Sequence, residues 1–198
     1  MNPFSSLTIW IVLATVIPGF ITIACLYLIF SWVFQGEHLC LPALNNWIGV
    51  SLGVSIMIIT QTFGILQEKM FMCCELYPKD IKGINGEDID VENTYKRMYG
   101  VLAGLQKEDD THGHMQRIIG QYFLTVNNLV AYVLSIIVVM VILLLNPELY
   151  SLRVVGFTLV MVLLYVFTFF VMRVRFRSMI QSVSVLQNRI AKREEKES

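Results

Sequence analysis

Four long runs of uncharged, mostly apolar residues divide the chain. They contain no Asp, Glu, Lys, Arg or His and extend over Leu7 to Phe34, Trp47 to Leu66, Tyr122 to Leu145 and Val154 to Met172. Each run reaches about 20 residues, the length that a helix needs to cross roughly 30 Å of hydrocarbon. The pattern predicts an all-α integral membrane protein with four transmembrane helices, at about 7–34, 47–66, 121–145 and 154–172.

The segments outside the spans carry helical patterns of their own. Apolar residues step by three and four along two stretches, which are Val91, Tyr95, Met98, Leu102 and Leu105, and Phe176, Met179, Val183, Leu186 and Ile190. Such steps are typical of amphipathic helices. We therefore expect a transmembrane hairpin at 1–66, a small helical cytoplasmic segment at 67–120, a second hairpin at 121–172 and a helical cytoplasmic tail at 173–198. The middle segment is too small to bury a strong core alone, so we expect it to pack on its copies in an oligomer or on the tail.

Composition and charge agree with a membrane protein and predict its orientation. Hydrophobic residues make up 56% of the chain and charged residues 15%, against about a quarter charged in soluble domains. Seven Lys and Arg residues lie between the second and third runs and seven in the tail, whereas the other two loops hold only Arg153. The positive-inside rule then places both termini and the middle segment in the cytoplasm. We expect a multi-pass protein of a bacterial inner membrane or a plasma membrane. Because topology explains these basic residues, we expect no nucleic-acid partner.

A row of polar side chains follows one face of the third span. Gln121, Thr125, Asn128, Tyr132 and Ser135 are separated by four, three, four and three residues, which gathers them within about an 80° arc of a helix. Extended backward at the same spacing, the row includes His114 and Arg117. The row either lines a water-filled pathway, with His114 and Arg117 at its inner mouth, or forms hydrogen bonds between helices.

The second span has two opposed faces. Gly49 and Gly53, with Gly64 further along, form a face of small residues that lets helices approach closely. Ser51 and Ser55 lie on the opposite face. This pattern predicts either two helix neighbours or a helix on the glycine face and water on the serine face, where the serines would assist in lining a pore.

Pro18 and Gly19 interrupt the first span. Proline lacks a backbone donor, so the carbonyl of Ala14 loses its helical partner, and glycine adds local freedom. The pair predicts either a static bend or a hinge.

No catalytic motif is present, and the usual acid and base groups lie outside the four runs. The sequence therefore predicts neither an enzyme nor a cofactor. The densest group of possible metal ligands is Asp109 and Asp110 with His112 and His114. Two histidines only two residues apart do not share a helical face, so we expect a turn in which Asp110 or Thr111 caps the helix, rather than a metal site.

In layout the chain resembles subunits of several four-span oligomeric channel families, and small membrane effectors of prokaryotic antiviral defence. The resemblance rests on inner termini, short outer loops and a cytosolic middle segment. It implies a homo-oligomeric pore or ion channel gated from the cytoplasmic side, in the second case one that permeabilises the membrane. The expected partners are copies of the chain, the bilayer and a cytoplasmic regulatory ligand or protein. The alternative is a non-conducting scaffold that oligomerises through its polar helix faces.

Overall fold

Helices form nearly all of the described chain. The computed structural model describes residues 7–34, 46–74, 76–78, 80–83, 86–104 and 110–197. In chain order its elements are α1 (Leu7–Leu28), η1 (Ile29–Val33), α2 (Asn46–Cys73), α3 (Val91–Gly104), α4 (Asp110–Leu145), η2 (Pro147–Leu149) and α5 (Leu152–Glu197). The short elements are a π-helical turn, η1, and a 3₁₀ turn, η2. Among the described residues the only β pairing is an isolated bridge between Lys82 and Asp88.

Four helices are long and apolar enough to cross a membrane, which confirms the four-helix prediction. They are α1 with η1, α2, α4 and α5. Three of them continue past the predicted spans, because nothing in the adjoining sequence stops a helix. Thus α2 runs on to Cys73, α4 begins already at Asp110, and α5 extends through 46 residues into the tail.

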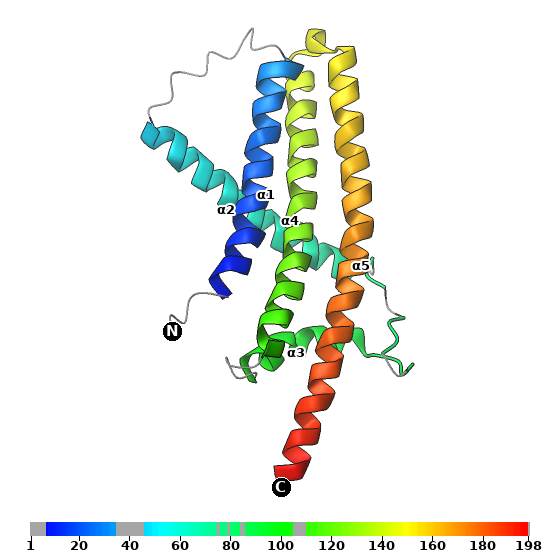
Figure 1. Ribbon diagram of the computed structural model, residues 1–198. Coiled ribbons are helices and arrows are strands. Elements are labelled where there is room, and N and C mark those ends of the chain that lie inside the picture. Colours follow the sequence, from blue (N-terminus) through cyan, green and yellow to red (C-terminus); the bar gives the residue numbers. More distant parts are fainter. Residues whose placement is uncertain are drawn as a thin grey trace.

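The helix α4 lies at the centre of the arrangement. It packs against α1, α5 and α2, and α2 also packs against α1. In Figure 1, α1, α4 and α5 run side by side, whereas α2 crosses them obliquely. The start of α1, the helix α3 and the last turns of α5 lie at the same end of the molecule (Figure 1). The predicted topology requires this arrangement, and the side of the membrane that this end faces stays a prediction.

The larger of two apolar cores joins the non-membrane helices to the spans. The apolar residues of the tail, from Phe176 to Leu186, pack together with Met98 of α3 and with α4, from Met115 to Leu129. The middle segment was expected to pack either on its copies or on the tail. Its helix α3 packs on the tail, since α3 and α5 are in contact. Asp90 caps α3, because its carboxylate accepts a hydrogen bond from the amide of Asn93 at 3.1 Å.

Candidate functional site

Two hydroxyls of the polar row on α4 lie inside the protomer. Thr125 is 8% exposed and Ser135 is fully buried. Each donates a hydrogen bond of 2.7 Å to the carbonyl four residues earlier in its own helix, at Gln121 and Ala131. Because these hydroxyls already have partners and are covered by neighbouring helices, they give water no polar surface in the described protomer.

The other members of the row also face neighbouring helices. Gln121 accepts a hydrogen bond of 2.7 Å from the guanidinium of Arg175 on α5. Tyr132 packs, partly buried, on the second apolar core, which α1, η1, α4 and α5 share. The Oδ1 atom of Asn128 is buried and has no partner among the described residues. The row therefore lies against neighbouring helices, and water reaches it only if the helices of the protomer separate.

The helix α2 has the opposite character, because it packs on one side only. In the apolar stretch of α2, 11% of the residues are buried, compared with 33% in α1, 28% in α4 and 22% in α5. Ser51 and Ser55 are exposed, and the Ser55 hydroxyl donates to the carbonyl of Ser51 at 2.9 Å. Thr62, which is also exposed, makes the same kind of bond to Ile58 at 2.8 Å. The hydroxyl face of α2 thus points away from the rest of the protomer.

The glycine face of α2 packs closely at one position. A Cβ on Gly64 would overlap the Oδ1 atom of Asn127 on α4, whereas a Cβ on Gly53 would lie 3.8 Å from Ile23 of α1. At Gly49 no atom of the described residues lies within 4 Å of such a Cβ. Close approach inside the protomer therefore rests on Gly64, and close packing at Gly49 stays a prediction about another copy.

The region of α1 around Pro18 is tied to both neighbouring helices. The Asn127 side-chain amide donates a hydrogen bond of 2.7 Å to the Ala14 carbonyl, the one that Pro18 leaves without its helical donor. On the next turn Thr22 bonds to the Pro18 carbonyl at 2.9 Å and lies 3.1 Å from the hydroxyl of Thr60 on α2. A Cβ on Gly19 would overlap Met57 of α2. These contacts hold the Pro18 region in one position in this structure.

A buried carboxylate joins the C-terminal end of α2 to α3 and α4. Glu68 is 8% exposed, and its Oε1 atom accepts hydrogen bonds from the hydroxyls of Tyr95 on α3, at 2.5 Å, and Tyr122 on α4, at 3.0 Å. The Tyr122 hydroxyl is also bonded to that of Tyr77. Because Tyr122 uses its single proton toward Glu68, Tyr77 is the donor in this second bond.

The same group reaches α5 through an aromatic stack. The ring of Tyr77 stacks on Phe176 with centroids 4.1 Å apart. Burial raises the pKa of the Tyr77 phenol, so its hydroxyl keeps its proton at neutral pH and remains a donor. We call Glu68, Tyr77, Tyr95, Tyr122 and Phe176 the carboxylate joint. It connects the C-terminal end of α2 with α3, α4 and α5.

The two residues predicted at an inner mouth lie in the first turns of α4. Both His114 and Arg117 are exposed, and His114 borders a cavity between α4 and α5. Of the four possible metal ligands, Asp109 and the side chains of Asp110 and His112 lie outside the described residues. In the part of the chain that the structure describes, no three His, Cys, Asp or Glu side chains group as metal ligands.

The comparisons with known proteins add no relative. No protein-family model matches the chain, and neither curated proteins nor solved structures include a match. The functional interpretation therefore rests on the residues and their contacts.

Two residues of the site escape sequence reasoning. Glu68 follows Gly64 by four residues, so an extension of the glycine face of α2 by one turn would have indicated that it points into the protomer. Asn127 lies beside the predicted row rather than on it. The carbonyl of Ala14, which Pro18 leaves without its helical donor, indicates that some other donor must be present in the membrane. The sequence does not indicate which residue supplies that donor.

Proposed function

We propose that the protein forms a homo-oligomeric membrane pore that is gated from the cytoplasmic side and lined by the hydroxyl face of α2. The observation that carries this proposal is the one-sided packing of α2, whose exposed face bears Ser51 and Ser55 while its other face meets α1 and α4. One protomer encloses no pathway of its own in the described residues, so the lining face has to be completed by further copies.

The exposed face of α2 is suited to a pathway with low polarity and no charge at depth. Ser51, Ser55 and Thr62 recur along it, and Lys69 continues the same face at the inner end. Hydroxyls in such a pathway provide hydrogen bonds to water without the cost of an ionisable group in the membrane. In this proposal the lining role passes from the row on α4 to α2, because Thr125 and Ser135 are buried in the protomer.

The carboxylate joint supports control from the cytoplasmic side. Glu68 lies on the same helix as the proposed lining residues, and Tyr95 belongs to α3, outside the spans. A displacement of α3 or of the tail therefore acts on the inner end of α2 directly. Packed elements of this kind transmit a local change because they have discrete arrangements.

Ion flux through liposomes that contain the purified protein tests the proposal. Because a gated pore is closed at rest, flux is measured for the native protein and for Tyr95→Phe, which removes one donor to Glu68 and should raise the flux several-fold. In the Tyr95→Phe background, the double change Ser51→Leu and Ser55→Leu should abolish most of the flux. Ser31→Leu is the matched control, since Ser31 is an exposed hydroxyl bonded to its own helix at 2.7 Å but lies on η1.

Absence of flux in both the native protein and Tyr95→Phe would contradict the pore. It would favour the second candidate, a non-conducting scaffold, for which the specific observation is that Thr125 and Ser135 are buried and bonded within α4, so that they offer water no pathway. Oligomers in detergent or nanodiscs are expected in either case, so the oligomeric state must be combined with flux to separate the two.

A membrane-permeabilising role in prokaryotic antiviral defence is a narrower form of the same proposal. Its support is the compact four-span layout, together with a cytoplasmic end that is coupled to α2. If it holds, a bacterial host that carries the gene should survive phage challenge better than one that carries the Ser51→Leu and Ser55→Leu form. Equal survival would contradict this narrower role and leave the pore proposal untouched.

A further inference from the structure

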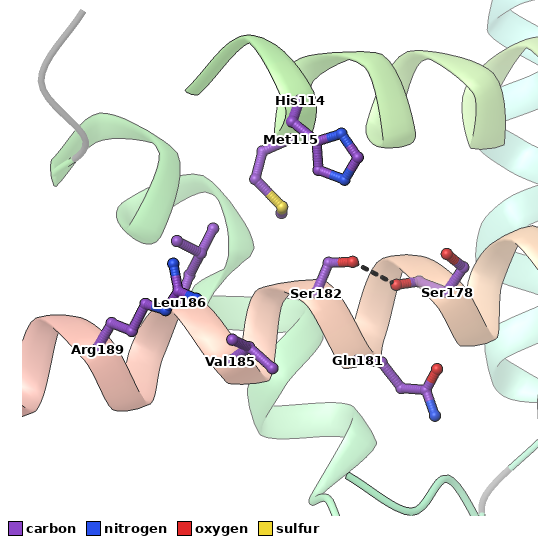
Figure 2. A pocket seen from close by; sticks show the side chains of 8 residues that line it. All are labelled: His114, Met115, Ser178, Gln181, Ser182, Val185, Leu186 and Arg189. Carbon is purple, nitrogen blue, oxygen red and sulfur yellow. Dashed lines mark hydrogen bonds between the residues drawn. The ribbon is translucent and has the colours of Figure 1, made fainter. Parts of the chain in front are cut away.

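A cavity of about 280 Å³ lies between the start of α4 and the part of α5 beyond its span. It is lined by His114, Met115, Ser178, Gln181, Ser182, Val185, Leu186 and Arg189. Figure 2 shows His114 and Met115 of α4 facing Ser178 and Ser182 of α5 across this space. The volume is at the lower end of the range for small-molecule sites, about 300–1,000 Å³.

The polar groups of the cavity favour an anion. Arg189 carries a fixed positive charge, and His114 offers ring nitrogens from the opposite helix. Neither residue makes a hydrogen bond or an ion pair with another residue in the described part of the chain. No carboxylate occurs among the described residues that line the cavity. A guanidinium that is not engaged by the protein is a preferred partner of phosphate and carboxylate groups.

The remaining lining residues favour an organic ligand over a bare ion. Val185 is half-buried at the wall of the cavity, and Met115 and Leu186 border it as buried members of the larger core. The Ser182 hydroxyl donates to the Ser178 carbonyl at 2.9 Å, so its oxygen still has capacity to accept a hydrogen bond from a ligand. A small molecule with one apolar, ring-like part and one anionic group fits both kinds of surface.

The position along α5 separates a soluble ligand from a lipid. Ser178 and Arg189 follow Met172, the last residue of the predicted span, by six and seventeen residues, or about 9 and 26 Å along a helix. The headgroup layer on each side of the hydrocarbon is roughly 5–8 Å thick. The charged end of the cavity therefore lies in the aqueous phase, on the side that the charge distribution assigns to the cytoplasm, and lipid headgroups stay at the level of Arg173 and Arg175.

We propose that this cavity binds a small soluble organic anion of about the size of a mononucleotide, with Arg189 and His114 on its anionic group and Met115, Val185 and Leu186 against its ring. The further step, that this molecule controls the pore, rests on the proposed function. Its route is short, since Leu186 of α5 and Met115 of α4 border the cavity and belong to the core that also contains Tyr77 and Phe176.

The experiment is calorimetric titration of the full-length protein in nanodiscs of zwitterionic lipid, with adenosine monophosphate as the probe and adenosine as the uncharged control. Adenosine monophosphate should bind, and adenosine should bind about tenfold more weakly or worse. Arg189→Gln should weaken binding of adenosine monophosphate by about tenfold. Arg177→Gln is the matched control, because Arg177 is exposed on the same helix but does not line the cavity, and it should leave binding unchanged.

Three results would overturn the site: no heat with adenosine monophosphate, equal affinity for adenosine, or a loss in Arg177→Gln as large as in Arg189→Gln. A fourth is loss of binding when the nanodiscs contain an anionic lipid, which would assign the cavity to lipid headgroups. Because binding is measured without ion flux, a negative titration leaves the pore standing, and a protein that binds but conducts nothing leaves the site standing.

Discussion

Asn127 and Asn128 are neighbours in the sequence but have opposite environments in α4. Asn127 is 6% exposed and donates to the Ala14 carbonyl, whereas the Oδ1 atom of Asn128 is buried without a partner among the described residues. Only Asn127 thus supplies a donor to a carbonyl that has lost its own. In a membrane such a carbonyl finds no water to replace the missing amide.

At the residue scale we predict that Asn127→Ala lowers the free energy of unfolding by about 1 kcal/mol, because the Ala14 carbonyl loses its donor. Equilibrium unfolding in mixed detergent micelles measures the change. Asn128→Ala is the matched control and should have the smaller effect, since it removes a group with an unsatisfied acceptor. An equal or greater loss in Asn128→Ala would refute this assignment of roles.

The two asparagines also show what the sequence reveals about single residues. Spacing along a helix places Asn128 in a row with Thr125 and Tyr132, and the structure keeps them on one face. Spacing along one helix gives no information about Asn127, whose partner Ala14 lies 113 residues away. A contact between distant helices depends on which faces meet, and apolar periodicity shows only which faces exist.

At the scale of elements, the attachment of α3 depends on the carboxylate joint and on the apolar face of the tail. Tyr95 provides both a hydrogen bond to Glu68 and contact with Phe176, at a centroid distance of 6.2 Å. On the outer face of α3, Lys96 and Glu92 form an ion pair of 2.6 Å whose side chains are 70% and 74% exposed. Exposed pairs of this kind contribute little to stability.

We therefore expect Tyr95→Phe to increase amide hydrogen exchange throughout α3, because Glu68 loses its shortest hydrogen bond while the ring stays in place. Lys96→Gln, on the same helix, should leave exchange nearly unchanged. Hydrogen exchange followed by mass spectrometry reports both variants. Exchange in α3 that responds equally to the two changes would show that the carboxylate joint does not hold this helix.

The elements themselves were largely predictable, and their contacts were not. Charge-free runs identified four spans, and steps of three and four identified α3 and the tail as amphipathic. The oblique course of α2 (Figure 1) and the burial of Glu68 were not foreseen, because both depend on the shape of α1 and α4 where they meet α2. A glutamate just past an apolar run is ordinarily a solvated charge, and only the two tyrosine donors make its burial tolerable.

At the scale of the whole molecule, the four spans form a protomer in which α2 is the least buried span. Thr125 and Ser135 of the row on α4 are buried in the protomer, whereas α2 leaves Ser51, Ser55 and Thr62 facing outward. In the pore that we propose, α2 lies at the inside and the row on α4 lies in the walls. This arrangement separates the residues that contact water from those that hold the protomer together.

The measurement that tests this arrangement most directly is the reaction of single cysteines with a charged thiol reagent during flux. Cys25, Cys40, Cys73 and Cys74 are first replaced by alanine, and the fluxes of Ser55→Cys and Thr125→Cys are then compared in liposomes, in the Tyr95→Phe background. We predict that the reagent blocks flux through Ser55→Cys and does not affect Thr125→Cys. Block through Thr125→Cys with no effect on Ser55→Cys would contradict it and return the lining role to the row on α4.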